Sequence, residues 1–277
     1  MKQGISLLWL LLLGGMTLAA LADTQSEAEL SLEAIRKELE GPVHILLENG
    51  SRSAGQIVHW DGRALKLEVT LDAGRAQMTY AAEDLREIRF PGFEHLALLR
   101  EWIRQPERAE DALALFDAFY QQRQAYLPYL RPAELNLFVD YVLFALDQDE
   151  ALLAIALVED LHPLIQDAGQ LDSLDEAVLL ASFQAGMHED AAQRAEAWIE
   201  TAPPAGDSAL GWRILAELRF NNEKYEEALW TALYPIAFAN QNLPEHLELC
   251  YAFAIAAAQE TRQKPIAERL IREMRQR

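Results

Sequence analysis

The spacing of apolar residues divides the chain into two parts. Between residues 43 and 90, apolar and polar residues alternate in short runs, a pattern that predicts β-strands. From residue 93 onward, apolar residues instead recur every three or four positions, which predicts amphipathic helices. We therefore expect an α+β multidomain protein, in which a small β module precedes a helical domain.

Five strands are predicted in the alternating part, at residues 43–48, 54–60, 65–70, 76–80 and 85–90. Asn49-Gly50 is a typical hairpin turn between the first two strands. Residues 81–84 suit a single helical turn, and residues 25–40 have helical composition that ends at Gly41-Pro42. Five short strands with a helical turn before the last one predict a small SH3-like barrel.

The helical part contains a repeat centred on alanine. The candidate anchors are Ala112, Ala151, Ala191, Ala228 and Ala267, which are separated by 39, 40, 37 and 39 residues. A near-constant period of this size is typical of an α-solenoid, in which each helix pair buries its apolar face against its neighbours. Small residues at the anchors would let paired helices approach closely, and we expect about five hairpins.

The best repeat, residues 179–203, resembles the tetratricopeptide repeat. Gly186 would cap the first helix, Ala191 would lie where the helices meet, and Pro203 would follow the second helix. The next unit follows the same scheme, with Asn222 at the turn and Ala228 as the anchor. Because these units exceed the usual 34 residues, a generic α-hairpin solenoid remains an alternative.

The β module resembles the first half of an Sm-like fold. The resemblance rests on one motif: Val43-x-Ile45-x-x-Glu48-Asn49-Gly50, then Gly55, Asp61 and Leu65-x-Leu67. Sm-like RNA binders place an asparagine after the aspartate and a basic glycine motif near the end, and this chain has neither. The resemblance therefore implies the barrel shape and not RNA binding, and an OB-like or plain SH3-like barrel would leave a similar pattern.

The first residues are typical of a secretory signal peptide. Lys2 precedes an apolar run over residues 5–13, and Ala20-Leu21-Ala22 forms a small-x-small cleavage site. An uncleaved N-terminal anchor is the alternative. The predicted organisation is a signal peptide (1–22), an N-terminal helix and linker (23–42), a barrel (43–92) and a repeat domain (93–277).

Cysteine content bears on the compartment. Cys250 is the chain's one cysteine, so no internal disulfide can form, and it is expected to be a small buried residue. Export without disulfides fits a bacterial envelope. We expect a periplasmic or secreted protein of a Gram-negative-type bacterium, without stable membrane insertion after signal cleavage.

The charge is strongly negative and uneven. The formal net charge is −20, and residues 109–207 hold 19 acidic residues against three basic ones. The last predicted helix is locally basic. Strong acidity disfavours nucleic acid and anionic membranes as partners. It could attract a basic partner, or the basic last helix of a second copy, while a plain solvated surface is the alternative.

No catalytic or metal-binding motif is present. The sequence has no phosphate loop, no G-x-S-x-G, no H-E-x-x-H and no C-x-x-C. His188-Glu189-Asp190 is the most polar histidine cluster, and its place at a helix start favours a structural role. We predict a protein that is not an enzyme and has no cofactor.

Trp198, Trp212 and Trp230 have helical packing spacings and are expected in the core.

The leading hypothesis is an exported scaffold or adaptor that binds a protein or peptide in a helical-repeat groove. The tetratricopeptide resemblance implies that groove residues come from first helices: Asn136, Asp140, Ser182, Gln184, Arg213, Glu217 and Asn221. The alternative is a module that binds cell-wall glycan or a small ligand through the barrel. His59 and Trp60 would line that barrel face, although packing in the core or at an edge is the other interpretation.

Overall fold

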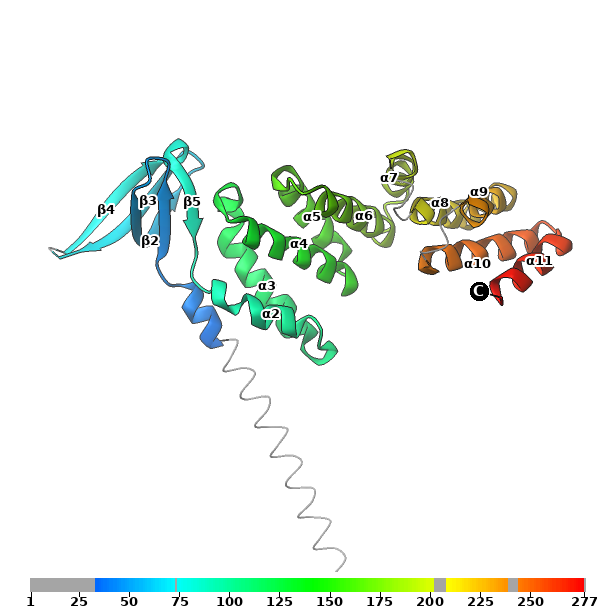
Figure 1. The fold of residues 1–277 in the computed structure, drawn as a ribbon, viewed down its shortest axis with the longest axis horizontal. Helices are drawn as coiled ribbons and strands as arrows, with labels where there is room; N and C mark the ends of the chain where they lie inside the picture. Colours follow the sequence, from blue (N-terminus) through cyan, green and yellow to red (C-terminus); the bar gives the residue numbers. More distant parts are fainter. Residues whose placement is uncertain (1–32, 73, 202–207, 239–243, 277) are drawn as a thin grey trace, which may run out of the picture. The chain divides into compact units, whose positions relative to one another are not determined.

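A computed structural model describes residues 33–72, 74–201, 208–238 and 244–276 (Figure 1). The predicted signal peptide and the first part of the predicted N-terminal helix lie outside these residues. The chain forms an antiparallel sheet followed by helical hairpins, which confirms the predicted α+β class. It divides into two compact units, an N-terminal unit (residues up to 148, with 159–167) and a C-terminal unit (149–158 and 168–277). The four predicted segments and the boundaries between them stay predictions.

The sheet has five strands in the order β4-β3-β2-β1-β5, all antiparallel to their neighbours. The five predicted strands are confirmed, as is the helical turn before the last one. The elements are β1 (Val43–Leu47), β2 (Arg52–Trp60), β3 (Ala64–Leu71), β4 (Gly74–Ala81), η1 (Ala82–Asp84) and β5 (Leu85–Arg89). Within the described residues, β4 and β5 end the strand order, so a closed barrel remains a prediction.

Strand β2 changes partners at Gly55. Residues 52–55 of β2 pair with β1, and residues 56–60 pair with β3. A Cβ atom at Gly55 would clash with the carbonyl oxygen of Glu68 on β3, so the close approach of the two strands requires glycine here. The buried face of the sheet carries Ile45, Leu67 and Ile88, which are almost fully shielded from water.

The sheet packs on helices within the N-terminal unit. A short helix over residues 33–39 precedes the sheet. After it follow η2 (Phe93–His95), α2 (Leu96–Trp102), η3 (Pro106–Arg108), α3 (Ala109–Arg123), η4 (Gln124–Tyr129) and α4 (Pro132–Asp147). The ring of Phe116 on α3 stacks on Tyr141 of α4, with centroids 4.7 Å apart and planes 5° apart. Both rings are fully buried, so this stack is part of the helical core of the unit.

The C-terminal unit is built from consecutive helical hairpins. Its helices are most of α5 (Ala151–Leu161), then α6 (Ala168–Gln184), α7 (His188–Thr201), α8 (Ser208–Asn221), α9 (Tyr225–Phe238), α10 (Pro244–Glu260) and α11 (Lys264–Met274). From α6 onward each helix packs on the next, and α8 also packs on α10. The core around α9 and α10 is rich in buried alanines, which let the helices approach closely.

The turns inside these hairpins share one geometry. Gly186, Glu223 and Arg262 have positive φ values of 73°, 60° and 59°, the left-handed conformation that commonly ends a helix. The N–H one residue later donates back across the turn in each case, as from Met187 to the carbonyl of Ser182 (3.0 Å). In the second hairpin Asn222 lies in the turn, as predicted, and the left-handed residue is its neighbour Glu223.

The anchor alanine lies five residues after the left-handed residue in each of these turns. Ala191 and Ala228 are fully buried, as predicted. Between α4 and α5, Asp149 has φ 61°, and the N–H of Ala154 donates to the carbonyl of Glu150. The anchor there is therefore Ala154, which is fully buried, and the predicted Ala151 is wrong by three residues.

Candidate interaction surface

Three aromatic side chains form an exposed ridge along α9. Trp230, Tyr234 and Phe238 are four residues apart, so they lie on one helix face. Their exposed fractions are 59%, 49% and 76%. Large apolar side chains gathered at one exposed place mark interaction sites more often than single ones do. We call these three residues the α9 ridge.

The ridge is held in place by ring contacts. The Tyr234 ring stacks on Trp212 of α8, with centroids 4.3 Å apart. Its other neighbour is Phe238, with centroids 5.1 Å apart and planes at 47°. Since Trp212 belongs to the preceding helix of the same hairpin, the ridge has a fixed position on that hairpin.

The opposite face of α9 supplies its packing. Ala228, Leu229 and Ala232 are fully buried against the core, and Pro235 is buried within the helix. Thr231 donates to the carbonyl of Glu227 (2.7 Å). The buried face thus anchors the helix, and the outer surfaces of the ridge side chains stay exposed to water.

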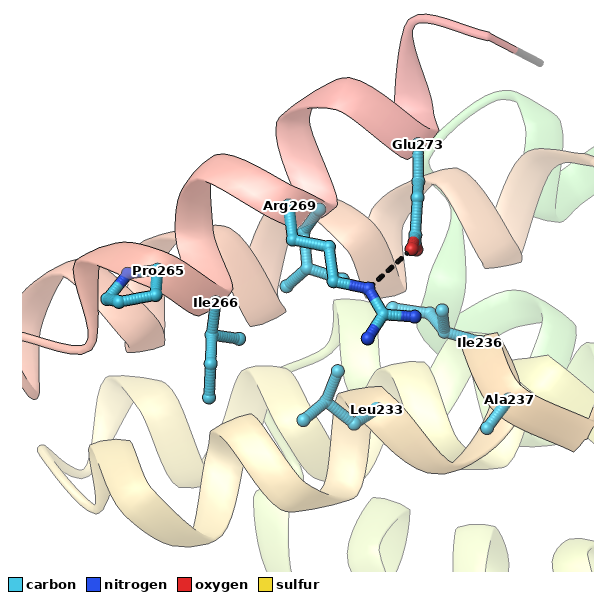
Figure 2. Close-up of a pocket in the computed structure, with 8 residues that line it drawn as sticks. Leu233, Ile236, Ala237, Pro265, Ile266, Arg269 and Glu273 are labelled. Atoms are coloured by element: carbon cyan, nitrogen blue, oxygen red, sulfur yellow. Dashed lines mark hydrogen bonds and ion pairs between the residues drawn. The ribbon is translucent and has the colours of Figure 1, made fainter.

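A groove of about 540 Å³ lies beside the ridge, between α9 and α11 (Figure 2). Its lining is mostly apolar and consists of Leu233, Ile236, Ala237, Pro265, Ile266, Arg269, Leu270 and Glu273. Sites that bury a ligand commonly have volumes of roughly 300–1,000 Å³. Because α9 and α11 are both second helices of their hairpins, the groove differs from the first-helix groove expected from the sequence.

One ion pair borders the groove. The Nε of Arg269 donates to Oε1 of Glu273 at 2.7 Å, one helical turn further along α11. This hydrogen bond and the charge of Glu273 raise the pKa of Arg269 above its ordinary value. Figure 2 shows the guanidinium reaching over the groove toward Leu233, while 75% of the side chain is exposed. An Arg269–Glu273 ion pair therefore lies at the mouth of a groove whose other lining residues are apolar.

The C-terminal unit holds five of the residues predicted to line a groove. The prediction is wrong for Ser182, which is fully buried and donates to Oδ2 of Asp190 at 2.7 Å, because it faces the partner helix α7. Arg213 and Glu217 pair on α8 at 3.1 Å and are half-buried. Gln184 and Asn221 are exposed at the ends of α6 and α8.

The other two predicted groove residues belong to the N-terminal unit. Asn136 and Asp140 are half-buried on α4. Burial raises the pKa of Asp140, and the charge of Arg100, 3.7 Å away, partly opposes that shift. Of the seven predicted residues, Arg213 and Glu217 are the two for which a mutual contact is observed.

The predicted ligand-binding face of the sheet is corrected at Trp60. Its ring packs on Tyr126 and Tyr129 of η4, with centroids 5.5 Å and 5.9 Å apart. Trp60 thus joins the sheet to the helices of the same unit, which is the packing interpretation that the sequence left open. His59, the neighbouring candidate, is exposed on β2.

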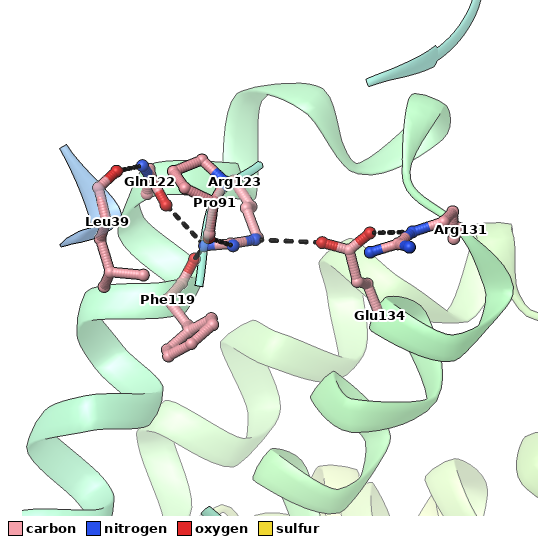
Figure 3. Close-up of polar contacts among 7 residues, drawn as sticks. All are labelled: Leu39, Pro91, Phe119, Gln122, Arg123, Arg131 and Glu134. Carbon is pink, nitrogen blue, oxygen red and sulfur yellow. Dashed lines mark hydrogen bonds and ion pairs between the residues drawn. The ribbon is translucent and has the colours of Figure 1, made fainter. Parts of the chain in front are cut away.

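A buried charged pair connects the sheet to the helices (Figure 3). Arg123, at the end of α3, is 1% exposed and donates through Nε to Glu134 of α4 at 3.3 Å. It also donates through Nη2 to the carbonyl of Pro91, just beyond β5, at 2.7 Å. Its guanidinium lies 5.0 Å from the Phe90 ring and 4.6 Å from the Phe119 ring. Burial lowers the pKa of Arg123 to about 10, so it remains charged at neutral pH.

The remaining candidates for chemistry are the metal-ligating side chains and the cysteine of the described residues. No group of three or more histidine, cysteine, aspartate or glutamate residues there could hold a metal ion. Cys250 is fully buried, as predicted, with Sγ 3.8 Å from the carbonyl of Ala209. Across the described ranges, no helix combines the length and apolarity needed to span a membrane.

The α9 ridge is a feature that sequence reasoning missed. Trp230 was expected in the core and is instead exposed, whereas Trp198 and Trp212 are half-buried. The sequence of α9 does indicate an exposed apolar face, because it carries two apolar stripes and a helix buries one of them in its own core. Its anchor stripe contains Ala228 and Ala232, and a second stripe contains the ridge.

Comparison with known proteins gives no family. No protein-family model matches the chain, and no curated protein matches it. Two similar solved structures are the Podosopora anserina putative kinesin light chain with nearly identical TPR-like repeats and a single-substitution variant of that protein. The identity is 15% for both, with TM-scores of 0.46 and 0.47, over 66% of this chain and 92% of theirs.

Proposed function

We propose that the C-terminal unit binds another protein and that the chain works as a non-enzymatic scaffold or adaptor. The observation that carries this proposal is the α9 ridge, in which Trp230 and Phe238 expose 59% and 76% of their surface. Tryptophan and tyrosine are among the residues that most often dominate binding energy at protein interfaces.

The ridge has two properties of a binding surface. Burying its exposed apolar area would release water from three large side chains, a favourable contribution. The contact between Tyr234 and Trp212 already restricts the ridge, so less side-chain entropy is lost on binding. The groove beside it adds further apolar surface.

The compartment is a separate part of the proposal. The pattern of residues 1–22 is typical of a signal peptide, so the partner would be another exported or envelope protein. The excess of acid over residues 109–207 would favour partners with basic surfaces elsewhere on the array.

A second candidate function is binding of a small anion on the sheet. A hollow of about 280 Å³ is lined by His44, Arg52 and Arg89, with Ile45 and Leu46. The register places His44 directly opposite Arg89. Titrating inorganic phosphate while following the His44 ring by NMR tests this candidate. Saturable shifts that disappear in Arg52→Ala would support it, and unchanged spectra would exclude it.

Affinity capture with purified protein tests the scaffold proposal. The bait is residues 23–277, and the extracts are envelope fractions at low and at high salt. Wild-type protein is compared with a Trp230→Ala/Phe238→Ala double variant and with Leu152→Ala, which removes an equally exposed apolar side chain from α5 (70% exposed). We expect a partner that the double variant loses and the Leu152 variant keeps. Equal capture by all three proteins would contradict the proposal.

A further inference from the structure

We propose that the groove between α9 and α11 binds an amphipathic helix of the partner protein, with a carboxylate beside Arg269. This inference rests on the proposed function and names the chemistry of the partner. It joins three observations: an apolar groove with helical walls, an exposed aromatic ridge along one side, and the Arg269–Glu273 ion pair at the other side, with the guanidinium over the groove.

The walls of the groove favour a helix over an extended segment. Leu233 and Ile236 come from α9, and Ile266 and Leu270 come from α11, so the floor consists of side chains on helices. Helical backbone has its own hydrogen bonds and offers no strand edge to a partner. A segment that enters must satisfy its own N–H and C=O groups, which a helix does.

The two sides of the groove differ in chemistry. The α9 side carries the aromatic ridge and has no charged residue from Trp230 to Phe238. The charged side chains of α11 are Lys264, Glu268, Arg269, Arg272 and Glu273, three basic against two acidic, and Glu273 is the less exposed member of the Arg269 pair at 34%. A partner helix would therefore lie with its apolar face toward the ridge and the groove, and its acidic flank toward α11.

Arg269 is placed to recognise that flank. Its contact with Glu273 uses Nε, whereas the terminal nitrogens carry four more N–H donors over the groove. Guanidinium groups bind carboxylates through paired donors, which gives geometric specificity. A lysine on the partner would instead face a like charge.

The occupant is not a further repeat of this array. The groove lies between two second helices, and α11 turns an exposed charged surface, including Lys264, Glu268 and Arg272, toward water. Helical arrays end with a polar outer face of this kind. The groove is therefore lateral to the array and open to a separate helix.

Fluorescence anisotropy with two synthetic peptides tests the inference. Both peptides carry a leucine stripe at i, i+3, i+4 and i+7, one with glutamates beside the stripe and the other with lysines. We expect residues 23–277 to bind the glutamate peptide at least about tenfold more tightly. Arg269→Glu should reverse this preference, a gain that a misfolded protein would not show.

The matched control is Arg194→Glu on α7. Arg194 contacts Asp190 at 2.7 Å one helical turn away, as Arg269 contacts Glu273, but it lies outside the groove. Equal affinity for both peptides, or an unchanged preference in Arg269→Glu, would overturn the inference. If neither peptide binds while the ridge variants still lose a captured partner, the inference fails and the scaffold function stands. A dimer of the free protein that Arg269→Glu dissociates would make a second copy the occupant and would also overturn it.

Discussion

Tyr234 stacks on Trp212 with ring centroids 4.3 Å apart and planes at 29°, although nearly half of Tyr234 is exposed to water. The contact joins α9 to α8 within one hairpin. An exposed aromatic side chain that is held in this way contributes little to the stability of the fold, because its outer surface remains in contact with water. It does present a preformed surface to a partner, and the function proposed for the chain depends on that surface.

Replacing ridge residues should separate binding from stability. Phe238→Ala and Trp230→Ala remove exposed side chains, so the free energy of unfolding should change by about 0.5 kcal/mol or less. Partner affinity should fall by about tenfold or more for each, as expected for aromatic anchors. Urea denaturation and binding titration measure the two effects, with Leu152→Ala as the control that changes neither by much.

The buried pair of Arg123 and Glu134 should matter far more to stability. Arg123→Met removes one of the two arginines that contact the buried carboxylate of Glu134 and leaves Arg131, 2.9 Å away, as its partner. The N-terminal unit should therefore lose about 1.5–3 kcal/mol. Replacing both residues by apolar ones of similar size should recover part of this loss. Thermal and urea unfolding measure it. Arg100→Ala breaks a pair whose side chains are 55% and 41% exposed, and should cost about 1 kcal/mol at most. Equal losses for Arg123→Met and Arg100→Ala would contradict this prediction.

The repeated turn predicts two substitutions of opposite sign. Gly186 has φ 73°, so Gly186→Ala forces a Cβ into the left-handed region and should destabilise by about 1 kcal/mol. Glu223 already carries that strain at φ 60°, so Glu223→Gly should stabilise by about 0.5 kcal/mol after the entropy cost of glycine. Urea midpoints of the two variants check the prediction. A shift in the same direction for both would show that backbone strain does not decide these positions.

Asp190 should contribute to the acid sensitivity of the C-terminal unit. Hydrogen bonds from Arg194 and then from Ser182 lower the pKa of its carboxyl below the usual 3.8. A carboxyl with a lowered pKa stabilises the fold above its unfolded pKa and loses that effect as the pH falls through the folded pKa. The stability difference between wild type and Asp190→Asn should therefore be largest near pH 7 and shrink below about pH 4. Urea unfolding over this range measures it, and a difference independent of pH would exclude the ionic contribution.

The strands and most hairpins were predictable because their signals are local. The hairpin turn Asn49-Gly50, the alternation of residues 43–90 and the anchors at Ala191 and Ala228 need no knowledge of distant contacts. The prediction of Ala151 as the anchor, where the structure has Ala154, also has a local cause. Both alanines lie in the first turn of α5, and the left-handed backbone at Asp149 decides between them.

The site was harder to predict because exposure depends on what packs against a helix. Trp230 has the spacing of a core residue, and the buried alanines Ala228 and Ala232 already fill the place it would have taken. The tetratricopeptide resemblance predicts Ser182 in a groove because it lies on a first helix, yet its hydroxyl donates to Asp190 on the partner helix inside the hairpin. Both outcomes are set by tertiary packing, which periodicity alone does not encode.

Site-specific photo-crosslinking tests directly whether the partner binds at the α9 ridge. A photoreactive phenylalanine analogue replaces Phe238 on the ridge, or Leu152 on α5 as the control, in residues 23–277 incubated with the captured partner. We expect a one-to-one adduct from position 238, competed by unlabelled wild-type protein, and little adduct from position 152. Equal labelling from the two positions, or labelling from position 152 alone, would contradict partner binding at the α9 ridge.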